Sequence, residues 1–222
     1  MYTRLRTRLA SLSCTFVLAA ALMGCGGPLS HTVDGFDLSA ISADKRPAVE
    51  KGEKDAAAAR AAADEAKTKV TTAKEAVEAA EKAVEAKEGD LKIAEASLKL
   101  EEAKASADRD AAVAKGEGEV KKKEQALELA KATLKLAEAQ LTFAEKHAVW
   151  SEKTWIVALA KHELAKLDAK GGSGPKYDET HATFEKQVAE AEAELAESKG
   201  ERAEAEQEVK EAESKVSKAK TG

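Results

Sequence analysis

Small and apolar residues recur every seven positions through most of the chain, which is the period of packed helices and not of strands. A first row consists of Ala56, Ala63, Val70, Val77, Val84, Leu91, Leu98, Ala105 and Ala112. A second row stands three residues further on, at Ala59, Ala66, Ala73, Ala80 and Ala94. The two rows form one narrow apolar stripe, which predicts a long helix over about 45–115.

The segment after Gly118 carries a wider apolar face. One row is Leu127, Leu134, Leu141, Ala148 and Trp155, and another is Leu129, Leu136, Phe143, Trp150, Val157 and Leu164. Two rows with alanines between them need two neighbouring helices, so we expect a central helix over about 118–170. Trp150 and Trp155 lie about 140° apart around such a helix, so they cannot both point at one neighbour. We expect them to fill the core between helices; the alternative is that one of them faces outward and marks a binding patch.

The sequence Gly171-Gly172-Ser173-Gly174-Pro175 marks a turn that no helix crosses. A third helix is expected over about 176–219, with a stripe at Tyr177, Phe184, Ala191, Ser198, Ala205, Ala212 and Ala219. If the chain reverses near residue 172, Val157 lies level with Val188, and Phe143 lies level with Arg202. The third helix then covers the second row of the central helix.

The boundary between the first two helices is less sharply defined. Gly116 and Gly118 coincide with a one-residue slip in the heptad repeat. A reversal there places Leu134 level with Leu98 and Trp155 level with Val77. The alternatives are a single rod running through Gly116, with only the third helix folded back, and a coiled coil of several chains. We predict an all-α fold, an elongated antiparallel three-helix coiled-coil bundle over residues 45–222.

The composition agrees with a thin helical core. Aromatic residues make up 4% of the chain and charged residues 35%, so long charged side chains cover narrow seams of alanine. The chain has 41 acidic against 36 basic residues, and an acidic chain is a poor ligand for nucleic acid. We expect no nucleic-acid partner.

The N-terminal residues have the pattern of a targeting signal. Arg4, Arg6 and Arg8 precede an apolar run from Leu9 to Met23, as in a secretory signal peptide, here predicted over 1–24. The run is shorter than the about 20 apolar residues of a membrane-spanning helix. Glycines, Pro28 and short polar residues over 26–44 predict a flexible linker. Alternatively, the apolar residues of the linker dock on a partner; they are Val33, Phe36, Leu38 and Ile41.

The tetrapeptide Leu22-Met23-Gly24-Cys25 resembles the lipobox of bacterial lipoproteins. This resemblance implies cleavage before Cys25 and lipidation of Cys25, which then anchors the protein to a membrane through acyl chains such as palmitate. A plain secretory signal cut elsewhere is the alternative. Cys14 would leave with the signal peptide, so the mature chain would hold no free thiol for a disulfide or a nucleophile.

Two further resemblances concern layout. An anchor followed by heptads is similar to murein-lipoprotein-like envelope proteins, although this chain ends in Lys220-Thr221-Gly222 without their terminal lysine. The stretch from Lys135 to Leu141 resembles the helical hairpins of periplasmic adaptor proteins and efflux channels. Gly26, after the cysteine, is similar to the corresponding position in lipoproteins sent to the outer membrane. These resemblances imply a cell-envelope location, at the outer membrane and facing the periplasm.

Candidate chemistry is sparse. His162 and His181 fall near the 171–175 turn with Asp168 and Asp178, but their spacing matches no established metal-ligand motif. The sequence has no glycine-rich phosphate loop and no nucleophile elbow. We therefore expect no catalytic residue, metal, cofactor or small-molecule substrate, and we expect that the protein is not an enzyme.

Cys25 is the one site residue that the sequence predicts. The preferred function is a lipid-anchored structural or scaffolding protein that presents a coiled coil to protein partners or to other copies of itself. The alternative is a periplasmic binding module, either a holdase-like chaperone or an accessory adaptor of an export or motility machine.

Overall fold

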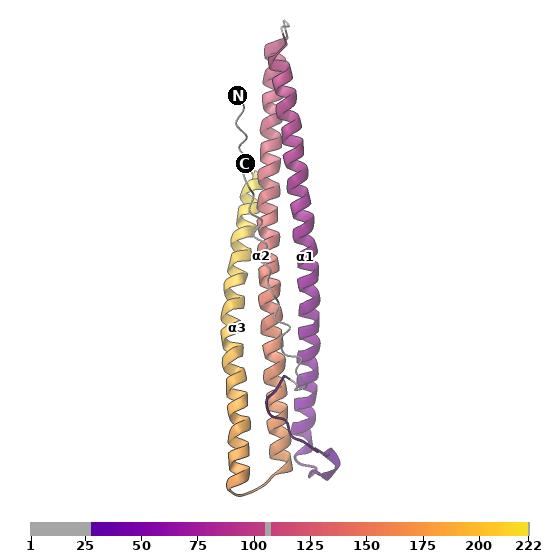
Figure 1. Ribbon diagram of the computed structural model, residues 1–222, viewed down its shortest axis with the longest axis vertical. Coiled ribbons are helices and arrows are strands. Elements are labelled where there is room, and N and C mark those ends of the chain that lie inside the picture. Colours follow the sequence, from indigo (N-terminus) through magenta and orange to yellow (C-terminus); the bar gives the residue numbers. More distant parts are fainter. Residues whose placement is uncertain (1–27, 105–107, 222) are drawn as a thin grey trace, which may run out of the picture.

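The computed structural model describes residues 28–104 and 108–221 and contains three long helices (Figure 1). They are α1 (Arg46–Glu102), α2 (Arg109–Lys170) and α3 (Pro175–Thr221), preceded by one short 3-10 helix, η1 (Leu38–Ala40). Within the described ranges the chain forms no strand. The all-α prediction is therefore confirmed.

Helix α2 lies between the other two helices, as its two apolar rows predict. Both α1 and α3 pack along α2, whereas α1 and α3 hardly touch each other within the described residues (Figure 1). Trp155 of α2 faces Arg60 of α1, and Trp150 faces Arg202 of α3. The two tryptophans thus meet different neighbours, and the three helices form a row, open between α1 and α3.

The core is a thin seam made mostly of alanine. Most of the buried residues belong to the predicted stripes, among them Ala56, Ala63, Ala66, Ala80, Leu127, Ala148, Val157, Phe184, Ala191, Ser198, Ala205 and Ala212. Lysine–glutamate pairs join neighbouring helices outside the seam, including Lys146 with Glu201 at 2.9 Å. Exposed pairs of this kind are worth well under about 1 kcal/mol each, so packing of the seam supplies most of the stability.

The turn between α1 and α2 corrects the sequence prediction. Helix α1 ends at Glu102, and α2 begins at Arg109 and runs without a break through Gly116 and Gly118. The pairing differs accordingly: Trp155 lies beside Arg60 and not beside Val77. The expectation of one rod through the first two helices is also wrong, because α1 ends at Glu102 and α2, which begins at Arg109, packs back along α1.

Gly116 and Gly118 led to a wrong turn prediction, because Gly116 is needed for close packing and does not mark a break in the helix. A Cβ on Gly116 would lie 2.9 Å from Leu98 Cδ1, so Gly116 lets the two helices approach closely. Gly118 has no neighbour within 4 Å of its Cβ position. An isolated glycine inside a helix costs only about 1 kcal/mol relative to alanine, which neighbouring contacts can offset.

The turn between α2 and α3 agrees with the prediction. Gly171 has φ 67° and Gly174 has φ 97°, conformations that favour glycine. Arg202 lies 5.9 Å from the Phe143 ring centroid, so the pairing expected for a reversal near residue 172 is present. Helix α3 ends well short of the 103–108 turn, which leaves a two-helix tip of α1 and α2 beyond it (Figure 1).

Residues 28–44 are not a flexible linker and are called the strap below. The strap runs back along the helices near the α2–α3 turn (Figure 1), and its side chains Leu29 and Ile41 are buried. Arg46 at the start of α1 holds its end, donating from Nε to the carbonyl oxygen of Ile41 at 3.0 Å. The amino-acid composition did not predict that residues 28–44 are docked, because the helices bind this segment largely through its main chain.

Candidate membrane tether and protein-docking surfaces

The predicted lipidation site, Cys25, lies outside the described residues, as does the apolar run that precedes it. The first described residue, Pro28, is three positions further along the chain. Within the described ranges no helix is long and apolar enough to cross a membrane. The described part of the chain thus begins close to the predicted anchor, and it shows which helices the segment after Cys25 contacts.

Two buried polar side chains bind the main chain of the strap. Glu163 of α2 accepts a hydrogen bond from the Val33 amide at 2.8 Å. Gln187 of α3 makes two bonds to His31, accepting from its amide at 2.8 Å and donating to its carbonyl oxygen at 3.1 Å. Glu163 is 4% exposed and Gln187 is 8% exposed. Buried polar groups of this kind need partners, and the strap supplies them.

The charge of Glu163 is paired beneath the strap. Lys166 Nζ lies 2.6 Å from Glu163 Oε1, and the same ammonium group lies 5.7 Å from the Phe36 ring centroid. His31 packs against Phe184 with ring centroids 6.1 Å apart. The strap is thus held by main-chain hydrogen bonds and ring contacts from both α2 and α3, above an ion pair whose carboxylate is buried.

Sequence reasoning missed Glu163 and Gln187 as functional positions. Val149 and Ile156 precede Glu163 at seven-residue intervals, so this row forms a third, partly apolar face of α2. That face was the available signal that something packs there. The identity of the covering segment was not visible, because main-chain hydrogen bonds leave no side-chain pattern in the strap.

The two histidines near the 171–175 turn, His162 and His181, make separate contacts. His162 is buried against Gly52 of α1, whereas His181 pairs with Asp168 at 2.9 Å and with Glu185 at 3.5 Å. No group of three or more metal-ligating side chains is placed to hold an ion within residues 28–104 and 108–221. Burial, and after it the charge of Lys166, lowers the pKa of His162.

A cluster of aromatic and basic side chains surrounds His147 in the middle of α2. Its ring stacks between Phe143 and Trp150, with centroids 5.9 and 5.5 Å away. Arg202 of α3 lies 4.6 Å from the Trp150 ring centroid, a cation–π contact. Burial lowers the pKa of His147, and the positive charges of Arg202 and Lys69 lower it further.

The most exposed apolar side chains lie on the two-helix tip. Ile93 is 73% exposed and Leu100 is 66% exposed, and they stand seven residues apart on α1. Side chains of this size at this spacing share one helix face. Both belong to the last ten residues of α1, and together they form an exposed apolar patch, called the tip patch below.

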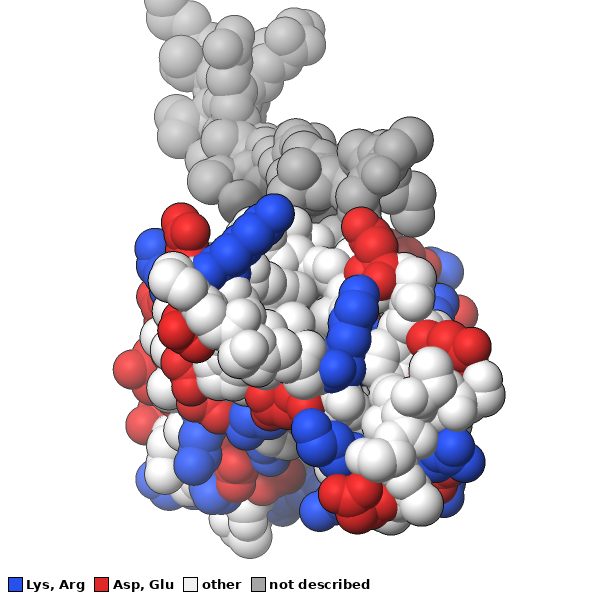
Figure 2. Space-filling view, turned by 90° about the horizontal axis from the view of Figure 1, so that it is seen from below, with Lys and Arg blue, Asp and Glu red and all other residues white. Residues whose placement is uncertain are grey.

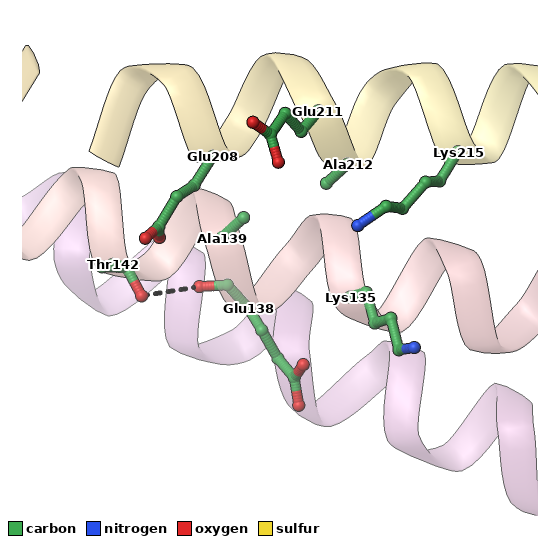
Figure 3. Close-up of a pocket in the computed structure, with 8 residues that line it drawn as sticks. All are labelled: Lys135, Glu138, Ala139, Thr142, Glu208, Glu211, Ala212 and Lys215. Atoms are coloured by element: carbon green, nitrogen blue, oxygen red, sulfur yellow. Dashed lines mark hydrogen bonds between the residues drawn. The ribbon is translucent and has the colours of Figure 1, made fainter. Parts of the chain in front are cut away.

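A shallow pocket of about 330 Å³ lies between α2 and α3 (Figure 3). Lys135, Glu138 and Thr142 line it from α2, and Glu208, Glu211 and Lys215 line it from α3. The Thr142 hydroxyl donates to the Glu138 carbonyl oxygen at 3.1 Å and is thereby used within its own helix. The side chains are charged and open to solvent, with no nucleophile held against a base.

The end of the rod near the α2–α3 turn has a mixed surface. In Figure 2, lysine and arginine side chains alternate with aspartate and glutamate around this end. The visible face thus presents no large field of one sign, and it lacks the basic patch that binds nucleic acid or strongly anionic lipid. No protein-family model, curated protein or solved structure matches the chain.

Proposed function

We propose that the protein is a lipid-anchored scaffold of the bacterial cell envelope, attached through Cys25 and presenting a helical rod to protein partners. The observation that carries the proposal is Leu22-Met23-Gly24-Cys25 at the end of a short apolar run behind three arginines. The rod adds support, because α1 and α2 are 57 and 62 residues long and expose side chains over a long surface.

Membrane attachment has a direct test. The protein purified from membranes should begin at Cys25, carry acyl chains by intact mass, and remain with membranes in high salt. Cys25→Ser should accumulate as an uncleaved precursor or leave the membrane. Cys14→Ser is the matched control, because Cys14 lies within the signal peptide and its loss should change nothing. A cleaved Cys25→Ser protein that stays on membranes would contradict the proposal.

The helices are proposed to pack as an antiparallel coiled coil within one chain. Heptad rows supply the seam, and cross-helix pairs support the reversal: Asp90 near Lys123, Lys67 near Glu152, and Lys153 bound to Glu194. Light scattering with small-angle X-ray scattering should give an elongated monomer. A dimeric mass, or a length near that of one continuous rod, would contradict this arrangement.

The second candidate function is a periplasmic binding module, and the exposed Ile93 and Leu100 favour it. A holdase-like chaperone needs accessible apolar surface, and the tip patch provides it. The mature protein should then suppress light scattering by a heat-denatured client, and Ile93→Ser with Leu100→Ser should abolish the effect. Glu95→Ser on the same segment is the control. Equal suppression by all variants would remove this candidate.

We propose a non-enzymatic role under either function. The pocket between α2 and α3 is shallow and lined by solvated lysines and glutamates, whose chemistry is that of a helix surface. Cofactors and small-molecule substrates have no part in the proposal. Localisation to the outer membrane, facing the periplasm, follows from the lipobox and Gly26, and membrane fractionation tests it.

A further inference from the structure

The docked strap leaves a very short connection between the rod and the predicted anchor. Cys25 and Pro28 are three residues apart. A fully extended chain covers at most about 3.6 Å per residue, so Cys25 lies within about 11 Å of Pro28 whatever its conformation. A flexible 26–44 linker would have reached further, but residues 28–44 are bound to the helices.

The attachment point lies on the flank of the rod and not at its end. His31 is bound to Gln187, which is twelve residues after the first residue of α3. At 1.5 Å per residue this places His31 about 18 Å from the start of α3 along the helix. In Figure 1 the indigo start of the strap lies further from the α2–α3 turn than the end of the strap that joins α1.

An upright rod does not fit these lengths. With the α2–α3 turn towards the membrane, the rod would reach at least about 7 Å deeper than Cys25, past a headgroup layer only about 5–7 Å thick. That depth would bring the exposed charges of Lys170, Lys176 and Asp178 to the hydrocarbon. Charged groups are expensive there. The opposite upright orientation fails because the two-helix tip lies several times further from the strap.

We propose that the rod rests against the membrane on the flank that carries the strap, with its axis inclined by no more than about 40° from the membrane plane. This inference rests on the proposed lipidation of Cys25. The limit on the inclination follows from two lengths. The tether from Cys25 to Pro28 lets the level of His31 stand at most about 11 Å above Cys25, and about 18 Å of helix separates that level from the start of α3. It places the far end of α2 within about 60 Å of the membrane, compared with about 90 Å for an upright rod.

The chemistry of the flank fits a zwitterionic lipid surface. Ser30, His31, Thr183 and Gln187 surround a shallow depression with Lys186 and Glu190, one charge of each sign. A patch without net charge gains little from anionic lipid. The acyl chains therefore hold the rod, and the strap sets its angle.

The height of the rod above the membrane tests this inference. The full mature protein is placed in a supported bilayer of phosphatidylethanolamine, and neutron reflectometry measures the thickness of the protein layer. We expect at most about 60 Å for the native chain. A layer near 90 Å, in a sample whose Cys25 carries acyl chains by intact mass, would overturn the inference and leave the proposed function standing.

A longer tether gives the matched comparison. A twenty-residue glycine–serine insertion between Gly27 and Pro28 adds a root-mean-square reach of about 25 Å and leaves the strap contacts in place. The layer should then thicken towards 90 Å. An unchanged thickness would overturn the claim that the short tether sets the angle, and absence of acyl chains from Cys25 would overturn both proposals.

Discussion

At the end of the rod near the strap, α1 and α3 both pack on α2 and the strap is bound to α2 and α3, whereas at the far tip only α1 and α2 face each other (Figure 1). Buried polar groups such as Glu163 and Gln187 are satisfied at the strap end, and the ring of Phe184 is enclosed. At the tip, Ile93 and Leu100 point into solvent. The difference places the buried polar contacts at one end and the exposed apolar side chains at the other, which under the proposals above are the membrane-facing end and the partner-binding end.

Truncating a core side chain at each end of the rod should show the largest difference between the two ends, measured as the loss of free energy of unfolding. Phe184 is 5% exposed and packs on His31, so Phe184→Ala should lower the free energy of unfolding by about 3–5 kcal/mol. Leu98→Ala, at the half-buried tip seam, should cost about 2 kcal/mol or less. Urea unfolding of both variants measures this, and equal losses would contradict the difference in packing.

Loss of the strap contact is the next effect in size. Glu163→Ala leaves the Val33 amide without its partner and should weaken strap docking by about 2 kcal/mol. Proteolytic cleavage within residues 28–44 should then accelerate about 30-fold, since 1.4 kcal/mol corresponds to a factor of ten. Glu190→Ala is the control, because Glu190 is exposed. Equal cleavage rates in the two variants would show that Glu163 does not hold the strap.

Glycine-to-alanine changes should have opposite signs at two positions of α1. A Cβ on Gly52 would lie 2.9 Å from His162 Nδ1 and 3.2 Å from His162 Cα, so Gly52→Ala should destabilise by about 1 kcal/mol. Gly89 has no neighbour within 4 Å, so Gly89→Ala should stabilise by about 1 kcal/mol. Thermal unfolding should shift by about 2–4 °C in each direction. Two stabilising changes would mean that α1 does not approach His162 this closely.

The smallest effect is a dependence of stability on pH. Burial lowers the pKa of His147 and His162 in the folded state, so the unfolded chain binds more protons below its histidine pKa of about 6.5. Stability should therefore be lost as the pH falls from 7.5 to 5.5. Replacing both histidines with glutamine should flatten this slope in urea titrations. A native slope of zero or of opposite sign would contradict their burial as neutral rings.

The heptad pattern predicted the helices well where apolar rows were long and turn residues were unambiguous. The α2–α3 turn, the seam of α3 and the central place of α2 all follow from it. The α1–α2 turn was misplaced because Gly116 is required for close contact with Leu98, while the true turn at 103–108 lacks glycine and proline. A glycine in a helix therefore signals either a break or a close approach, and the sequence alone does not separate the two.

The strap was the largest part of the candidate site that sequence reasoning missed. Its glycines and short polar residues have the composition of a linker, and its hydrogen bonds involve the main chain of His31 and Val33. Such bonds depend on where Gln187 and Glu163 lie in space. Heptad rows predict these positions only when the turns between the helices are placed correctly. The role of Cys25 comes from the resemblance of its tetrapeptide to a lipobox, and it stays a prediction.

Hydrogen exchange in the strap tests the central claim, that residues 28–44 are a fixed part of the rod. In the mature protein at neutral pH, we expect the His31 and Val33 amides to exchange at least about 100-fold more slowly than in an unstructured peptide, because each donates to a buried side chain. The Ser39 amide, bonded to the exposed Asp37 carboxylate, should be less protected. Exchange of the His31 and Val33 amides at the rate of an unstructured peptide would contradict the docked strap and the membrane orientation inferred from it.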